Sequence, residues 1–82
     1  MYVAPGEGAA RAAWIAGRRV GGAVQRNRAR RLLREAWWRL WTSTTPGHLV
    51  VLVAEPAIAG AKADEVTEEI RKLLMRAGVV RP

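Results

Sequence analysis

The chain has 82 residues, no cysteine and a formal net charge of +7. A chain of this length has a thin core, so we expect one domain over residues 1–82. The lack of cysteine and of any Cys/His cluster excludes disulfide bonds and a structural zinc site. Half of the residues are hydrophobic, which argues against global disorder. The longest apolar run is too short to cross a membrane and no secretory signal begins the sequence, so we expect a cytoplasmic location.

The positive charge is concentrated in one part of the chain. Nine arginines and one acidic residue, Glu35, lie between Arg11 and Arg39, whereas the positive and negative residues elsewhere nearly balance. A local basic field attracts polyanions through counterion release. Arginine outnumbers lysine twelve to two, which favours bidentate contacts to phosphate. The charge pattern therefore predicts a polyanionic partner.

The first half of the sequence predicts two short strands and a long helix. Residues 1–4 and 11–16 are expected to form strands around the turn P-G-E-G-A-A, with Trp14 and Ile15 on opposite faces of the second strand. Residues 23–43 contain no Gly or Pro and are rich in helix-forming residues, which predicts a helix. Its apolar stripe consists of Ala29, Leu32, Leu33, Ala36 and Leu40. Its arginines cover every other side of the helix.

The second half predicts one strand and one helix. Residues 48–55 read H-L-V-V-L-V-A-E. This continuous apolar run is typical of a strand that is covered on both faces and parallel to a neighbour. An amphipathic helix is expected to begin at Asp64 and to end before Gly78. Its predicted core positions are Val66, Ile70, Leu73, Leu74 and Ala77. The order β-β-α-β-α predicts an α/β (α+β) sandwich of two layers.

The basic segment also carries a specific motif. Residues 18–35 read R-R-V-G-G-A-V-Q-R-N-R-A-R-R-L-L-R-E. This run closely resembles the signature of the bacterial ribonuclease P protein subunit, basic-basic-V-G-x-A-V-x-R-N-R-x-K/R-R-x-x-R-E. The resemblance implies the fold of that family, in which the basic helix forms a left-handed crossover between two parallel strands.

The resemblance further implies a function without catalytic residues on this chain. The family's protein assists a catalytic RNA, which uses Mg²⁺ to remove the 5′ leader of precursor tRNA, and the protein itself holds no cofactor. The residues expected to contact RNA are Arg18, Arg19, Arg26, Asn27, Arg28, Arg30, Arg31 and Arg34. Asn27 has a second interpretation as a cap of the helix start.

The family's sheet also carries a cleft for the single-stranded leader, and Tyr2 and Trp14 are its candidate residues here. Trp14 has two interpretations: it stacks on a leader base, or it fills a bare face of the sheet. The family's N-terminal helix would precede Met1 and is absent from this sequence. We therefore expect part of the sheet to be uncovered, which would permit a homodimer through the exposed sheet or the tryptophans.

Two other functions fit the basic helix. A general RNA chaperone or ribosome-associated protein would use the same arginines without recognising the leader. A protein of the membrane surface would place the helix on anionic lipid. His48 is expected to be structural, and the acidic residues at the start of the second helix are explained by the helix dipole.

Overall fold

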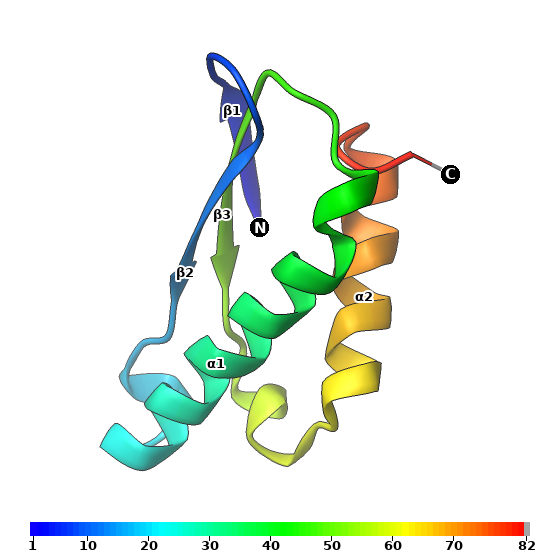
Figure 1. Ribbon diagram of the computed structural model, residues 1–82. Coiled ribbons are helices and arrows are strands. Elements are labelled where there is room, and N and C mark those ends of the chain that lie inside the picture. Colours follow the sequence, from blue (N-terminus) through cyan, green and yellow to red (C-terminus); the bar gives the residue numbers. More distant parts are fainter. Residues whose placement is uncertain (82) are drawn as a thin grey trace.

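The computed structural model describes residues 1–81. Its elements in chain order are β1 (Tyr2–Pro5), β2 (Arg11–Ile15), η1 (Arg18–Val20), α1 (Ala23–Leu40), η2 (Trp41–Ser43), β3 (His48–Val53), η3 (Pro56–Gly60) and α2 (Ala63–Arg76), where η marks a short 3₁₀ helix (Figure 1). The predicted order of strands and helices is confirmed. The long helix is three residues shorter than expected because its last turn tightens into η2.

The three strands form one mixed sheet in the order β1-β3-β2. β1 is antiparallel to β3, and β2 is parallel to β3. Because α1 connects β2 to β3, this helix lies in a crossover between two parallel strands, as the resemblance implies. The left hand of the crossover stays a prediction.

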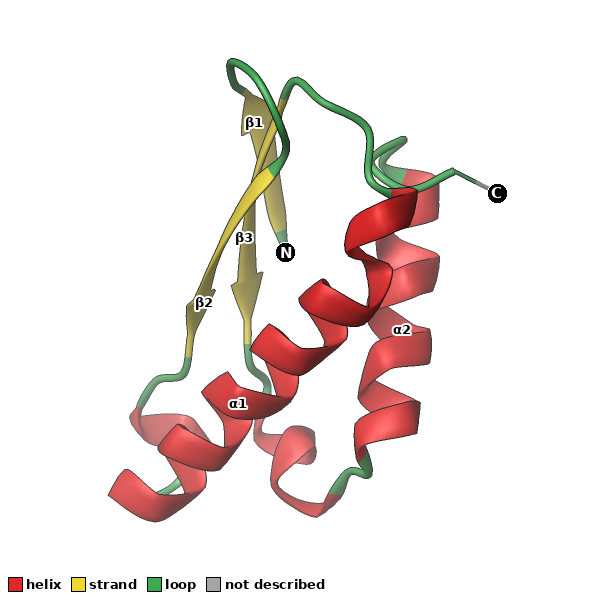
Figure 2. Cartoon of the chain, viewed as in Figure 1, coloured by secondary structure: helices red, strands yellow, loops and turns green. Residues whose placement is uncertain are grey.

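Both helices pack on the same face of the sheet, which gives the predicted two layers (Figure 2). Val50 and Leu52 of β3 are 1% and 2% exposed and belong to one core with the apolar sides of α1 and α2. Ala36 of α1 and Leu74 of α2 are completely buried. The small side chain at Ala36 lets the other core side chains come close to α1, so the layer of helices is tightly packed.

The opposite face of the sheet is open in this chain, which corrects the prediction that the apolar strand is covered on both faces. Leu49 and Val53 of β3 are 37% and 41% exposed, and Ile15 of β2 is 51% exposed. In α2, Leu73 is 39% exposed and Ala77 is also exposed, so these two are not core residues as predicted. The open face of the sheet has a simple cause, because both helices cover β3 from the same side.

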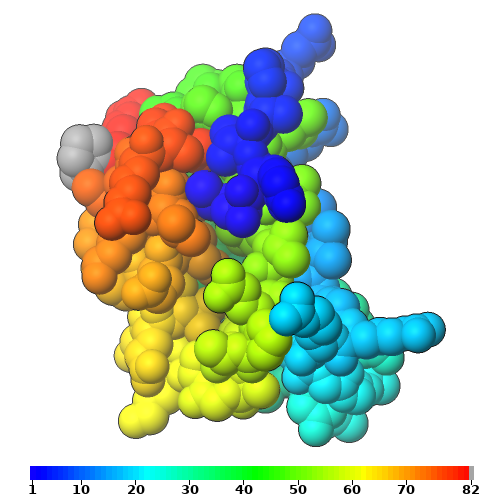
Figure 3. Space-filling model, turned by 180° about the vertical axis from the view of Figure 1, so that it is seen from behind, coloured from blue at the N-terminus to red at the C-terminus, as the bar shows by residue number. Residues whose placement is uncertain are grey.

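The residues after α2 complete the core. Gly78 adopts a φ of +76°, which is accessible to glycine and turns the chain back at the predicted end of the helix. Val79 and Val80 are then buried, and Val80 forms a β-bridge with Thr44. Figure 3 shows the face of the molecule on which the N-terminal residues, in dark blue, lie near the orange end of α2.

Candidate nucleic-acid interface

The exposed side of α1 carries a set of polar residues that we call the arginine strip: Asn27, Arg30, Arg31 and Arg34. Asn27 precedes Arg30 and Arg31 by three and four residues, and Arg34 follows them by four and three, so the four positions lie along one side of the helix. Arg31 and Arg34 are exposed and Arg30 is half-buried. Within residues 1–81, the carboxylate ion pairs involve Arg39 and Arg71 and none of the strip. Three guanidinium groups are therefore available to an external anion.

Asn27 orients one of these arginines. Its side-chain oxygen Oδ1 accepts a hydrogen bond of 2.6 Å from Nη2 of Arg30. Asn27 does not cap the helix start, because Gly22 occupies that position and has no side chain to do so. The capping interpretation of Asn27 is therefore wrong. The contact restricts the rotamers of Arg30 and directs its guanidinium along the surface of α1.

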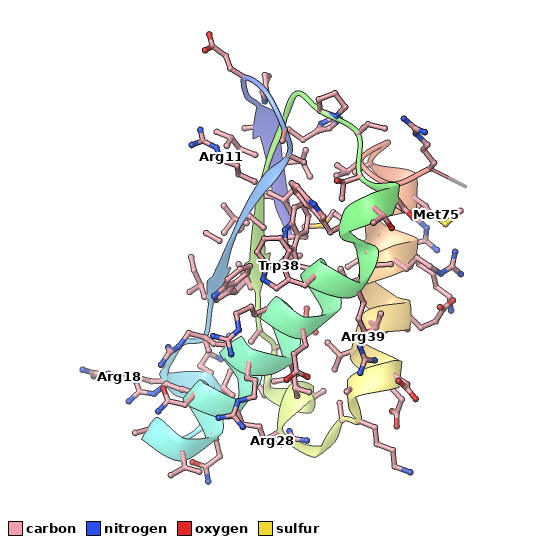
Figure 4. The ribbon with its side chains drawn as sticks, viewed as in Figure 1. Arg11, Arg18, Arg28, Trp38, Arg39 and Met75 are labelled. Carbon is pink, nitrogen blue, oxygen red and sulfur yellow. The ribbon has the colours of Figure 1, made fainter. Side chains whose placement is uncertain are left out.

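Arg28 has a structural role that the sequence did not predict. Its guanidinium donates hydrogen bonds to the carbonyl oxygens of Ile58, Ala59 and Ala61 at 3.3, 3.2 and 2.8 Å. These carbonyls belong to η3 and the residue after it, which lead into α2, and Figure 4 shows Arg28 directed toward that segment. The positive charge of Arg28 still adds to the basic surface, but three of its hydrogen bonds already go to these carbonyl oxygens.

The segment before α1 places two more arginines near its N-terminus. Arg18 and Arg19 belong to η1 and are exposed, and Arg18 projects away from the body of the molecule (Figure 4). Gly21 connects η1 to α1 with a φ of +142°, and a Cβ there would lie 3.0 Å from Cβ of Gln25. Glycine is therefore required at this turn, because other residues rarely adopt this φ.

The start of α1 is favourable for negative charge. Its first turn contains no acidic residue, and no side chain caps its backbone N–H groups. Free N–H groups and the helix dipole attract anions at such a terminus. Arg26, in the first full turn, is half-buried, and its Nε is buried without a hydrogen-bond partner among residues 1–81. The predicted RNA-contacting residues thus lie along η1 and α1, apart from Arg28, whose side chain is turned toward η3.

Tyr2 and Trp14 do not line one cleft. Tyr2 pairs with Val51 and Trp14 pairs with Leu52, and these two neighbours on β3 point to opposite faces. Tyr2 is 71% exposed on the open face, whereas Trp14 is half-buried against the core on the face that α1 covers. The structure therefore corrects the interpretation in which Trp14 fills the bare face of the sheet, and its stacking on a leader base stays a prediction.

The structure instead brings Trp14 to the other tryptophans. Trp14 lines a hollow together with Trp37, Trp38 and Trp41 of α1 and η2. Trp37 is 1% exposed and belongs to the core, whereas Trp38 is 56% exposed. The helical spacing of the last three tryptophans was visible in the sequence, but their meeting with Trp14 depends on how α1 crosses β2.

The acidic and histidine side chains of the described residues bear on whether the chain could hold a metal ion. No cluster of three or more His, Cys, Asp or Glu residues that could hold a metal ion occurs within residues 1–81. His48 contacts Oγ1 of Thr45 at 3.1 Å through Nε2, which agrees with a structural role.

Arg71 donates a hydrogen bond to the carboxylate of Glu68. This bond, together with the positive charge of Arg71, lowers the pKa of Glu68, and the same contact raises the pKa of Arg71. No helix in the described part of the chain is both long and apolar enough to span a membrane.

Comparisons with known proteins agree with the motif. The model of the family described as "Ribonuclease P" matches residues 1–78. The ribonuclease P protein component of Symbiobacterium thermophilum is 38% identical over 71 residues, which are 87% of this chain and 62% of that protein. The corresponding protein of Chloroflexus aggregans is 43% identical over 79 residues, which are 94% of this chain and 58% of that protein.

A solved structure supports the fold. The RNase P protein from Thermotoga maritima superimposes with a TM-score of 0.80 at 23% identity, covering 90% of this chain and 72% of that one. The chain spans about three fifths of the length of the two relatives above. On the match of the family model over nearly the whole chain, this protein belongs to the ribonuclease P protein family.

Proposed function

We propose that this chain acts as the RNA-binding protein subunit of ribonuclease P and assists a catalytic RNA in removing the 5′ leader from precursor tRNA. The observation that carries the proposal is the arginine strip, whose guanidinium groups have no carboxylate partner within residues 1–81. Like charges on one helix repel one another, so this arrangement is better explained by an external polyanion than by folding. Membership of the ribonuclease P protein family favours the catalytic RNA as that polyanion.

In this proposal the strip acts on the RNA backbone. Arg30, Arg31 and Arg34 form charge-assisted hydrogen bonds to phosphate oxygens, and binding releases counterions from the RNA. Arg18 and Arg19 extend the contact past the start of α1, where uncapped backbone N–H groups add donors for phosphate. Neutralising RNA phosphates lowers the repulsion within the folded RNA, which favours its compact, active form.

The chemistry of the reaction is assigned to the RNA. This chain supplies no general acid, general base or nucleophile in the proposal, and the Mg²⁺ ions are held by RNA phosphates, whose oxygen atoms are the ligands that Mg²⁺ prefers. The protein's part is to bind and orient. The proposed site of action is the cytoplasm, where precursor tRNA is made.

The open face of the sheet is the proposed binding surface for the leader. Tyr2 is an exposed aromatic residue on this face, which also carries Leu49 and Val53 on the neighbouring β3 and Ile15 on β2 beyond it. Exposed aromatic rings stack on unpaired bases of any sequence. Trp14 has no part in this surface, because it lies on the other face.

Reconstitution tests the proposal. The full chain is added to a bacterial ribonuclease P RNA at low Mg²⁺ concentration, and cleavage of precursor tRNA is followed. The proposal predicts faster cleavage than with RNA alone, and tighter binding of precursor tRNA than of mature tRNA to the complex. Faster cleavage with equal affinity for the two tRNAs would instead indicate a general RNA chaperone, and no acceleration would contradict the proposal.

A further inference from the structure

A hollow lies between β2 and the C-terminal half of α1, and its wall is aromatic. Its tryptophans are all four of the chain: Trp14, Trp37, Trp38 and Trp41. Three alanines on the strand side, Ala9, Ala10 and Ala12, leave room between the sheet and the helix, and the hollow has a volume of about 580 Å³. Arg11 and Glu7 lie at its rim. This volume is within the range of sites that hold small flat ligands.

Trp38 presents the largest exposed aromatic surface of the hollow. It is 56% exposed, and its ring meets Trp41 edge-on, with centroids 5.5 Å apart and an interplanar angle of 65°. Trp41 in turn packs against the buried Trp37 at 6.1 Å. The exposed indole is therefore supported by a chain of rings that reaches the core. An ordered, exposed tryptophan is typical of a binding surface rather than of a residue needed for folding.

The hollow is continuous with the arginine strip. Trp38 follows Arg34 by four residues and Arg31 by seven, so its side chain continues the same side of α1, roughly 6 Å beyond Arg34 along the helix axis. Figure 4 shows Arg11 at the outer edge of β2 and Trp38 on the side of α1 next to that strand. Arg34 therefore flanks the aromatic surface on α1, whereas Arg11 pairs with Leu49 and its side chain lies on the open face of the sheet. An unpaired nucleotide has the matching chemistry, a flat base flanked by phosphates.

We propose that this hollow binds an unpaired nucleotide of the RNA partner, with the base stacked on Trp38 and a flanking phosphate near Arg34. The inference rests on the proposed function, since it extends the RNA-binding surface by one site. Stacking on an indole does not depend on base identity, so the site secures a flexible part of the RNA without reading its sequence. A second copy of the chain is disfavoured as the occupant, because it would bring another +7 charge against Arg34 and the rest of the arginine strip.

A pair of probes separates stacking from charge. The full chain is titrated with a short oligoadenylate and with an abasic oligonucleotide of the same length, and tryptophan fluorescence and affinity are measured. Trp38→Ala is expected to weaken oligoadenylate binding roughly fivefold to tenfold and to leave abasic binding unchanged. Trp38→Phe should recover most of the loss. The control Leu73→Ala, which removes a comparably exposed apolar side chain from α2, should change neither affinity.

The outcomes separate this inference from the proposed function. If Trp38→Ala loses the same affinity for both probes, or loses affinity for neither, the stacking site is overturned. If Arg31→Ala and Arg34→Ala still weaken both probes in that case, the proposed RNA-binding function stands. Failure of the full chain to bind either probe or ribonuclease P RNA in low salt overturns the function as well. A dimer in sedimentation that Trp38→Ala dissociates would assign the hollow to self-association. Melting curves of each variant verify that it is folded.

Discussion

The stability of an Arg28 variant tests whether this arginine has a structural role that the exposed arginines of α1 lack. Arg28→Ala removes three hydrogen bonds that join α1 to the segment before α2. Two of them are long and two are exposed to solvent, so we expect a combined loss of about 1–2 kcal/mol rather than the full value for buried charged groups. For a domain of this size, that loss lowers the melting temperature by about 5–15 °C.

Arg31→Ala is the matched control for this prediction. It removes the same side chain from the same helix, three residues further on, where the guanidinium is exposed. Thermal unfolding followed by circular dichroism should show a clear drop for Arg28→Ala and a shift near zero for Arg31→Ala. Arg28→Lys should recover part of the stability, because an ammonium group can reach fewer of the carbonyls. Equal melting temperatures for the two alanine variants would refute the structural role of Arg28.

Three further predictions concern stability. Trp37→Ala should cost about 3–5 kcal/mol, because the side chain is 1% exposed, and should abolish cooperative melting; a normal melting curve would contradict it. Gly21→Ala should cost about 1–3 kcal/mol because of its φ of +142°, whereas Gly17→Ala, at a φ of −87° with open space around it, should be neutral by the same assay. Glu68→Gln should slightly lower the melting temperature near neutral pH. Because the Arg71 hydrogen bond lowers the pKa of Glu68 in the folded state, this contribution is present above the ordinary pKa of 4.5 and is lost as the pH falls through the folded-state value. The difference in melting temperature between Glu68→Gln and the parent should therefore disappear in acid. A difference that stays constant with pH would show that the ionised carboxylate of Glu68 is not its cause.

The local elements were predictable from the sequence because their signals are local. α1 begins directly after Gly22, as the glycines before it indicated, and its buried stripe of alanines and leucines follows the helical period. The basic motif lies within one contiguous run, so it identified the family without any knowledge of the fold. Because the buried stripe follows the helical period, the exposed face of α1 was predictable as well.

The tertiary relations were not predictable, because they depend on strand register and on the face that the helices choose. Tyr2 and Trp14 differ in face only because they pair with neighbouring residues of β3. An apolar strand such as β3 has the same sequence pattern whether one face or both are covered. Arg28 finds its carbonyl partners about thirty residues away, and no periodicity in the sequence marks such a contact.

The salt dependence of RNA binding tests the central claim most directly. The affinity of the chain for ribonuclease P RNA is measured over a range of salt concentrations and compared with that of a variant in which Arg30, Arg31 and Arg34 are all alanine. Each lost phosphate contact should reduce the slope of log affinity against log salt by about 0.7–0.9, so the triple variant should flatten it by about two to three units. An unchanged slope in a variant that melts like the parent would show that the arginine strip does not meet the RNA.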